Sequence, residues 1–269
     1  MIRTIFVVSD LHCGCRYGLY PADSKIKLQG DVSYLPSKGQ KQLYACWKDF
    51  WYNWVPKVSK GEPYAVVVNG DAIDGFHHQN TTHLTADQND QVNIAYELLG
   101  PIRDGAEKMY LIKGTEAHVG KAAENERNLA DKLGIESSWD LWLEMHNKLI
   151  HFSHHIGTTQ STFYSSTAPL KELVEMYNTA GQWKGRPPDV VIRSHRHQCV
   201  EVRVPTETGY GVSATTGCWQ LKTPYSYRLL SGRSGALHIG GHAVRYGSED
   251  AIFTRFKIYP FRREGIVKL

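Results

Sequence analysis

The sequence has no apolar run long enough to cross a membrane, and its N-terminal segment is not expected to act as a secretory leader. Its first apolar stretch ends at Ser9 and Asp10. That is far short of the ~20 residues that a membrane helix needs, and no small-residue cleavage site follows it. Internal repeats and low-complexity tracts are also absent from the 269 residues. We therefore expect one domain over residues 1–269, a cytoplasmic location and no membrane partner.

Cysteine content and net charge exclude further classes. The five cysteines are odd in number and scattered, which argues against a disulfide framework. Cys13 and Cys15 are spaced more tightly than the usual zinc-binding pair. The formal net charge of +4 is mild, so it favours anionic substrates only weakly and does not indicate a nucleic-acid-binding surface.

Histidine, in contrast, is abundant, with 13 residues. Six of them fall in three close pairs, which are His77 and His78, His154 and His155, and His195 and His197. A histidine-rich surface loop would explain one such pair. The last two pairs, however, directly follow short apolar runs that predict strands at residues 149–152 and 190–192.

Apolar runs of strand length alternate with helical patterns along the chain. Further strands are expected at residues 4–8, 64–68 and 109–112, and helices at 40–59, 88–99, 121–133 and 137–148. The aromatic face of the 40–59 helix is expected to pack in a core. The last third, rich in Gly, Thr, Tyr and Val, predicts mostly antiparallel strands. The fold class is therefore α/β, a mixed sheet sandwich with helices outside.

Most of the predicted strands end in side chains that bind metals. In open α/β sheets, ligands gather beyond the carboxyl ends of the strands. The candidates in chain order are Asp10 and His12, Asp71 and Asp74, Glu116 and His118, His154 or His155, and His195 and His197. Each motif alone is a weak indication. Five of them in order, each at a strand end, predict a shared metal centre.

The types and spacing of these residues indicate two divalent metal ions. In an extended strand end, residues i and i+2 point the same way, so Asp10 and His12 are expected to bind one ion together. Asp71 has two oxygens and could bridge two ions ~3.5–4 Å apart. Mixed imidazole and carboxylate ligands suit Mn, Fe or Zn better than Mg or Ca.

In this order the motifs resemble the calcineurin-like metallophosphoesterase family, whose pattern is D-x-H, G-D-x-x-D, G-N-H-D/E, a strand-end His and G-H-x-H. The resemblance implies a four-layer α/β/β/α sandwich with two mixed β-sheets flanked by helices. It also implies that one metal is held by Asp10, His12, Asp71 and His197, and the other by Asp71, His154 and His195. The segments SDLHCGC, GDAIDGFHH and GTEAHVG look like those of uncharacterised phage and prophage phosphoesterases, so the host cytoplasm is the expected location if the chain is phage-encoded.

Two motifs depart from the family pattern. The segment 114–118, GTEAH, lacks the Asn that normally ligates the second metal. We expect Glu116 rather than Thr115 in that position, because a carboxylate is at least as good an oxygen ligand as an amide. His118 would then protonate the leaving oxygen. The alternative for this segment is a helix N-terminus with a capping Thr. Ser194 replaces the Gly of the last motif, a mild change.

The remaining candidates lie beside these ligands in the sequence. His154 is favoured over His155 as the ligand, because it shares the facing of Ile150 and Phe152 in an extended strand. The resemblance implies that Asp74 supports the site by hydrogen bonding. Substrate contacts or support could come from His77, His78, His155 and Arg16. An ordinary surface loop is an equally good explanation for the first two.

The sequence thus predicts a metal-dependent phosphoesterase that hydrolyses phosphomono- or phosphodiesters by a two-metal-activated hydroxide. A phage-type nuclease acting on DNA or RNA is the alternative, for which lysines at 25, 27, 38 and 41 could supply a basic surface. A non-catalytic metal-binding module is a third hypothesis, and only the altered third motif favours it.

Overall fold

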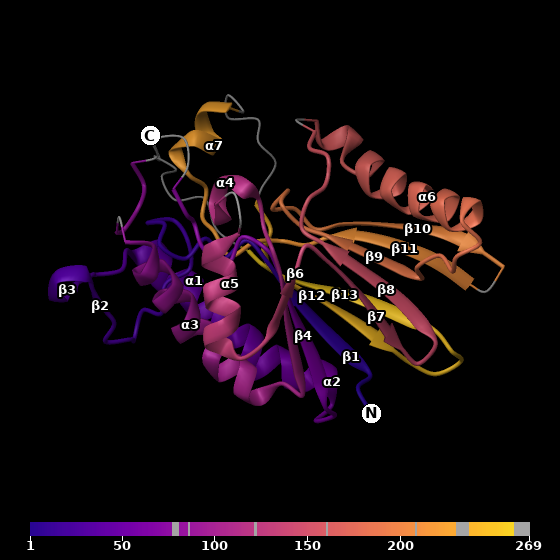
Figure 1. Ribbon diagram of the computed structural model, residues 1–269, viewed down its shortest axis with the longest axis horizontal. Coiled ribbons are helices and arrows are strands. Elements are labelled where there is room, and N and C mark those ends of the chain that lie inside the picture. The colour runs from indigo at the N-terminus through magenta and orange to yellow at the C-terminus, as the bar shows by residue number, and fades with distance from the viewer. Residues whose placement is uncertain are drawn as a thin grey trace, which may run out of the picture.

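Two mixed β-sheets form the centre of the structure (Figure 1). The computed structural model describes residues 1–76, 81–85, 87–120, 123–159, 161–207, 209–229 and 237–260. The first sheet has the order β13-β12-β1-β4-β5-β6. Its parallel strands are β1 (Thr4–Val8), β4 (Tyr64–Asn69), β5 (Lys108–Ile112) and β6 (Glu136–Ser138). Two antiparallel strands, β12 (Ile239–Tyr246) and β13 (Ile252–Tyr259), extend it beyond β1.

The second sheet has the order β10-β11-β9-β8-β7. Its strands are β7 (Asp140–Met145), β8 (Lys148–Ser153), β9 (Val190–Arg193), β10 (Val200–Thr206) and β11 (Gly209–Thr215). The three central strands β8, β9 and β11 are parallel, and the two edge strands are antiparallel to their neighbours. A separate short ribbon pairs β2 (Lys27–Leu28) with β3 (Val32–Ser33).

Helices cover the outer face of each sheet. The six-stranded sheet is covered by α1 (Lys38–Asp49), the π-helical η2 (Phe50–Trp54), α2 (Val55–Ser59), α3 (Gln88–Gly105) and α5 (Glu124–Leu133). The five-stranded sheet is covered by α6 (Thr167–Gln182). Short helices at the loops are η1 (Gln29–Asp31), α4 (Glu116–Val119), η3 (Thr162–Tyr164) and α7 (Pro224–Leu229). The predicted four-layer α/β/β/α sandwich is therefore confirmed.

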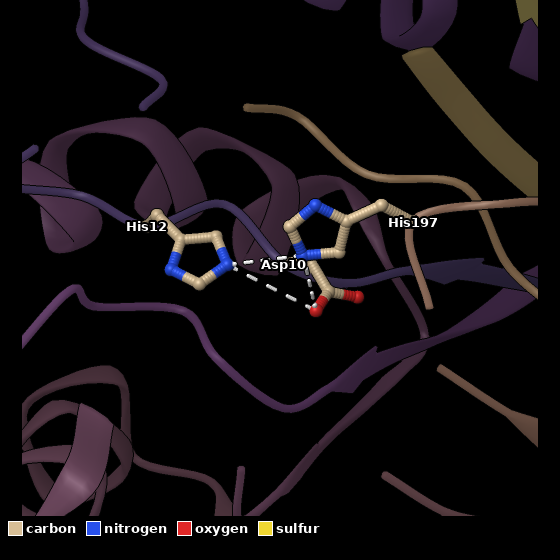
Figure 2. Close-up of side chains that lie close together, drawn as sticks. All are labelled: Asp10, His12 and His197. Atoms are coloured by element: carbon tan, nitrogen blue, oxygen red, sulfur yellow. Dashed lines mark hydrogen bonds and ion pairs between the residues drawn. The ribbon is translucent and has the colours of Figure 1, made fainter. Parts of the chain in front are cut away.

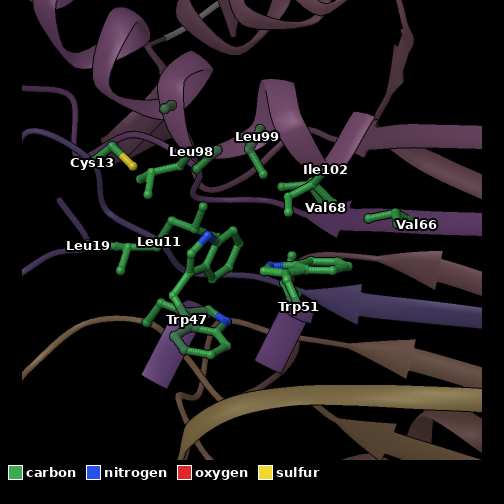
Figure 3. Packing of buried hydrophobic residues seen from close by; sticks show 14 of the residues in the cluster. Leu11, Cys13, Leu19, Trp47, Trp51, Val66, Val68, Leu98, Leu99 and Ile102 are labelled. Atoms are coloured by element: carbon green, nitrogen blue, oxygen red, sulfur yellow. The ribbon is translucent and has the colours of Figure 1, made fainter. Parts of the chain in front are cut away.

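Alternation along each strand divides the apolar side chains between two cores. On β1, Phe6 and Val8 pack toward the helices, whereas Ile5 and Val7 lie between the sheets. The helix-side core is rich in aromatic rings, and Figure 3 shows Trp47 and Trp51 among the leucines of α3. The prediction that the aromatic face of the 40–59 segment packs in a core is confirmed.

The helix predicted at residues 137–148 is wrong, because this segment forms β6, β7 and the start of β8. Leu141 and Leu143 alternate along β7 and pack into the core between the sheets. His146 and Asn147 follow with φ values of 50° and 66°. Two consecutive residues in this left-handed conformation make the tight turn that joins β7 to β8. Among the described residues, none of the helices combines the length and the hydropathy needed to cross a membrane.

The carboxyl ends of the central strands of both sheets meet at one edge of the sandwich. Asn69 at the end of β4 donates a hydrogen bond from Nδ2 to the carbonyl of Ser153 at the end of β8, at 3.1 Å. Directly after β9, the amide of Ser194 donates to the carbonyl of His154, at 2.9 Å. These bonds connect the loops that carry the predicted metal ligands.

Candidate metal centre

The first group of candidate ligands consists of Asp10, His12 and His197, each directly after a strand. Figure 2 shows the two imidazole rings turned toward one another above the Asp10 carboxylate. The Nε2 atom of His197 lies 3.2 Å from Asp10 Oδ1 and 3.3 Å from His12 Nε2. One candidate ligand atom from each residue lies within 4.8 Å of the others, which is the arrangement that a metal ion requires.

The second group consists of Asp71, His154 and His195. The Nε2 atom of His154 lies 3.0 Å from Asp71 Oδ2 and 3.9 Å from Asp10 Oδ1, so the two groups adjoin. The Nδ1 atom of His154 donates to the carbonyl of Asn69 at 2.7 Å, which fixes the ring with Nε2 facing the centre. His155, the other candidate, is exposed, and its ring packs against His195.

Most of these residues have a left-handed backbone conformation, which residues other than glycine rarely adopt. Positive φ values between 46° and 68° occur at five of the six candidate ligands, which are Asp10, His12, Asp71, His195 and His197. Each costs roughly 1–3 kcal/mol and persists only where the surroundings enforce it. The extended i, i+2 geometry expected for Asp10 and His12 is therefore wrong, although the two side chains do meet.

Paired loops enforce this strained backbone. The loop after β1 runs along the loop after β4, with Asp10 N donating to Gly70 O and His12 N donating to Asp71 O, at 2.9 and 3.0 Å. The segment after β8 packs so closely on Gly70 that a Cβ there would collide with the ring of His154. Gly70 also has a φ of 86°, so only glycine fits this position without strain.

Thr115, not Glu116, lies against the second group. Its backbone amide donates to Asp71 Oδ1 at 2.7 Å, and its hydroxyl donates to Asp71 Oδ2 at 3.0 Å. The same hydroxyl lies 3.3 Å from His154 Nε2 and 3.2 Å from His195 Nδ1. Glu116 begins α4 and is exposed. The oxygen expected from Glu116 is thus present in the centre, but it belongs to the preceding residue.

His118 and Asp74 both lie against His12, and the three side chains form a further group that could hold a metal ion. His118 donates from Nδ1 to the carbonyl of Asp74 at 2.8 Å, and its Nε2 lies 3.9 Å from Asp71 Oδ2. The buried Asp74 carboxylate lies 3.3 Å from Nδ1 of His12 and 3.4 Å from Nδ1 of His83. This contact to His12 matches the supporting role expected for Asp74, because carboxylates commonly orient metal-binding imidazoles. His83 was not predicted.

Beneath the candidate ligands lies a chain of buried hydrogen bonds that joins the two sheets. Asn69 Nδ2 donates to Ser194 Oγ at 2.6 Å, and Ser194 Oγ pairs with Thr216 Oγ1 at 2.8 Å. Thr216 in turn pairs with Ser9 Oγ at 2.6 Å. Ser9 and Ser194 directly precede the candidate ligands Asp10 and His195. These hydrogen bonds therefore fix the backbone next to both ligands. This explains the Ser194 that replaces the glycine of the family pattern.

The two central carboxyl groups are charged at neutral pH. Burial alone would raise the pKa of Asp10, but the neighbouring His197 and His154 lower it to about 2. Burial likewise opposes ionisation of Asp71, and His154 and His118 nevertheless hold its pKa well below the usual range. Both are almost fully buried, so nearby positive charge is what keeps them ionised.

The histidines divide into two protonation classes. Burial disfavours a charged His154, yet Asp71 and Asp10 raise its pKa to about 10. Against burial, Cys218 and Asp10 raise the pKa of His197 well above its ordinary value. His195 behaves in the opposite way, because burial and the neighbouring His154 lower its pKa to about 4.

The other sequence candidates lie outside the two groups. Arg16 is exposed, and its Nε donates to the carbonyl of His83 at 3.1 Å. His77 and His78 lie outside the described residues. Cys13 and Cys15 are buried free thiols whose pKa burial raises, so they stay protonated and are poor metal ligands.

The donor set of the two groups fits divalent transition metals. Neutral imidazole and carboxylate suit Zn, Mn and Fe, and each group offers three such donors in contact range. The outer nitrogens of His12 and His154 face Asp74 and a backbone carbonyl, which is the support typical of metal-binding histidines. Asp10 Oδ1 is buried, and imidazole nitrogens of His197, His154 and His12 lie 3.2, 3.9 and 4.0 Å from it, so candidate ligands surround this oxygen.

Comparisons with known proteins give a distant structural likeness. No protein-family model and no curated protein matches the chain. A metallophosphoesterase from Sphaerobacter thermophilus aligns over 97% of this chain and 90% of its own, with 8% identity and a TM-score of 0.42. An archaeal phosphodiesterase aligns over 94% and 99%, with 11% identity and a TM-score of 0.42. A Thermotoga maritima protein aligns over 96% and 100%, with 11% identity and a TM-score of 0.38. At such low values the likeness assigns neither a family nor an activity.

Proposed function

We propose that the protein is a metal-dependent phosphoesterase with a dinuclear centre. The observation that supports this proposal is the convergence of two adjoining groups of carboxylate and imidazole side chains, at the shared edge of two sheets. Such ligand pairs position a phosphoryl group between two cations and stabilise the charge that develops during its transfer.

In this proposal the first ion binds Asp10, His12 and His197, and the second binds Asp71, His154 and His195. Thr115 Oγ1 is the additional oxygen ligand of the second ion, in place of Glu116. The bridging role of Asp71 stays a prediction. Bound divalent cations would supply Lewis-acid chemistry, polarising phosphoryl oxygens and making water acidic enough to attack at neutral pH.

His118 is the proposed general acid. Because its Nδ1 donates to the Asp74 carbonyl, its Nε2 is the atom that carries or releases the second proton. Nε2 lies at the edge of the centre, 3.9 Å from Asp71 Oδ2, and the side chain is partly exposed. A proton held there can pass to the oxygen that leaves phosphorus. The substrate class is a phosphomono- or phosphodiester.

Hydrolysis of bis-p-nitrophenyl phosphate and p-nitrophenyl phosphate tests the proposal. Metal-stripped protein resupplied with Mn²⁺ is expected to hydrolyse at least one ester, and Asp71→Ala is expected to abolish this activity. Asp104→Ala, at an exposed position of α3, is the matched control and keeps full activity. The diester-to-monoester ratio then separates nuclease-like from phosphatase-like chemistry.

Two kinds of result would contradict the proposal. Two tightly bound metals without hydrolysis of either ester would favour the non-catalytic metal-binding module. Activity that survives chelation or the Asp71→Ala change would place any hydrolysis elsewhere on the protein. Metal content per chain is therefore measured on the same samples, by atomic emission.

A further inference from the structure

Glu126 is a fully buried carboxyl group that has no role in the proposed chemistry, and burial raises its pKa to about 8. It lies in the first turn of α5 and is 0% exposed. Leu129 and Leu133, three and seven residues later, share its inward-facing side of the helix and pack in the core. A buried acid on an apolar helix face is destabilising unless specific partners compensate it, so its partners indicate its purpose.

Each carboxylate oxygen of Glu126 accepts one backbone hydrogen bond. Oε1 accepts from the amide of Ala72 at 2.8 Å, and Oε2 accepts from the amide of Gly114 at 2.6 Å. Ala72 follows Asp71 in the loop after β4, and Gly114 precedes Thr115 in the loop after β5. One side chain therefore holds the two loops that carry the oxygen donors of the second ligand group.

The same two loops also contact each other directly. Thr115 donates to both oxygens of Asp71, and a Cβ at Gly114 would collide with the Asp71 carboxylate. The two loops are therefore already as close as their atoms allow, and the Asp71–Thr115 contact depends on this separation. Glu126 spans this separation through its bonds to the backbone amides of Ala72 and Gly114.

We propose that Glu126 is a positioning residue that sets the spacing between Asp71 and Thr115 and so preorganises the second metal site. The inference rests on the metal centre proposed above, though not on its activity. Both backbone partners are donors, so the role needs two acceptor oxygens at fixed distance. Gln offers one acceptor and one donor, and Asp offers two acceptors that are one methylene too short.

Metal affinity in Glu126→Gln and Glu126→Asp tests the inference. Loss of a partner that orients a ligand commonly weakens metal affinity 10–100-fold. We expect the Kd of one of the two Mn²⁺ sites, measured by titration calorimetry on stripped protein, to rise by that factor in both variants. In turnover assays, kcat falls and the KM for bis-p-nitrophenyl phosphate stays within twofold. Glu124→Gln, an exposed acid in the same helical turn, keeps the wild-type Kd.

Several outcomes would overturn the inference. A folded Gln or Asp variant with a wild-type Kd, whatever its Tm, would show that Glu126 only stabilises the fold. Calorimetry needs no turnover, so a protein that binds Mn²⁺ but hydrolyses nothing refutes the proposed function and leaves this test intact. Should neither variant fold, hydrogen exchange in the wild type decides, because the amides of Ala72 and Gly114 must exchange far more slowly than exposed loop amides.

Discussion

Thr115 places a single hydroxyl between three candidate ligands, and Thr115→Val removes that hydroxyl while keeping the side-chain shape. We expect the change to weaken the second Mn²⁺ site 10–100-fold, as measured by calorimetry, because the site loses one oxygen and Asp71 loses a hydrogen bond. Glu116→Gln, one residue further on, is expected to leave the affinity within twofold. The reverse ranking of the two variants would restore Glu116 as the ligand.

His118 is expected to matter most for substrates with poor leaving groups. A p-nitrophenolate departs without a proton, whereas an alkoxide needs one, so His118→Asn should lower kcat roughly 10²–10⁴-fold for an alkyl diester. For bis-p-nitrophenyl phosphate the loss should be much smaller. The ratio of the two kcat values, compared between wild type and variant, is the measurement. An equal loss on both esters would assign His118 to substrate binding instead.

At the residue scale, the sequence indicates which kinds of side chain supply the candidate ligands better than it indicates which individual residues do. The period-2 argument selected His154 over His155, and the structure places His154 in the second group and His155 outside it. The structure places Thr115 rather than Glu116 against the second group, and which of the two binds a metal stays a prediction. The contact of Thr115 with Asp71 joins residues 44 apart, and it depends on how closely two loops approach. Glu126 left a visible indication, a lone acid on an apolar helix face.

At the element scale, the periodicity of apolar residues was sufficient to predict most strands. It failed for a segment that is a strand only because it pairs with a neighbouring strand. Residues 140–145 have a strand alternation, but the segment is short and its flanks are polar, so local pattern alone did not separate it from a helix. Pairing of β7 with β8 stabilises the strand. The left-handed backbone at Asp10 and His195 was also unpredictable, because it is held by neighbouring loops rather than by local preference.

Strand β12 carries His242, which is fully buried beneath the ring of Phe256. Burial lowers its pKa to about 4, and Glu201, whose Oε2 lies 4.0 Å from His242 Nε2, only partly opposes this. The unfolded chain takes up a proton near the ordinary pKa of 6.5, whereas the folded protein does so only near 4. The free energy of unfolding should therefore fall as pH decreases from about 6.5 to about 4. Above that range His242 should contribute nothing to the pH dependence of this free energy.

The variant His242→Phe tests this contribution. Its unfolding free energy, from urea titrations of chelator-treated protein, should vary less with pH between 6.5 and 4 than that of the wild type. A difference on the order of 3 kcal/mol across the range is expected, from about 1.4 kcal/mol per pKa unit. Parallel curves for the two proteins would mean that His242 is protonated in the folded state.

At the scale of the whole molecule, the proposed metals would join the two sheets. Asp10 and Asp71 follow strands of the six-stranded sheet, whereas His154 and His195 follow strands of the five-stranded one. The four-layer architecture was predicted from the family resemblance of the motifs, whereas the strand ends by themselves predicted that the candidate ligands gather at one edge. An ion that binds only the folded protein should add about 2.7 kcal/mol to the free energy of unfolding when its free concentration is 100 times its Kd. Metal should therefore raise Tm.

Metal binding should release protons, because imidazole ligands must be neutral. With no metal bound, Asp71 and Asp10 hold the pKa of His154 at about 10, and His197 is also raised well above its ordinary value. Both are protonated at pH 7, whereas His195, with a pKa of about 4, is already neutral. Calorimetry in buffers of different ionisation enthalpy should thus detect protons released on metal binding at pH 7, with affinity rising toward pH 9. Affinity that does not vary with pH would mean that His154 and His197 are not the ligands.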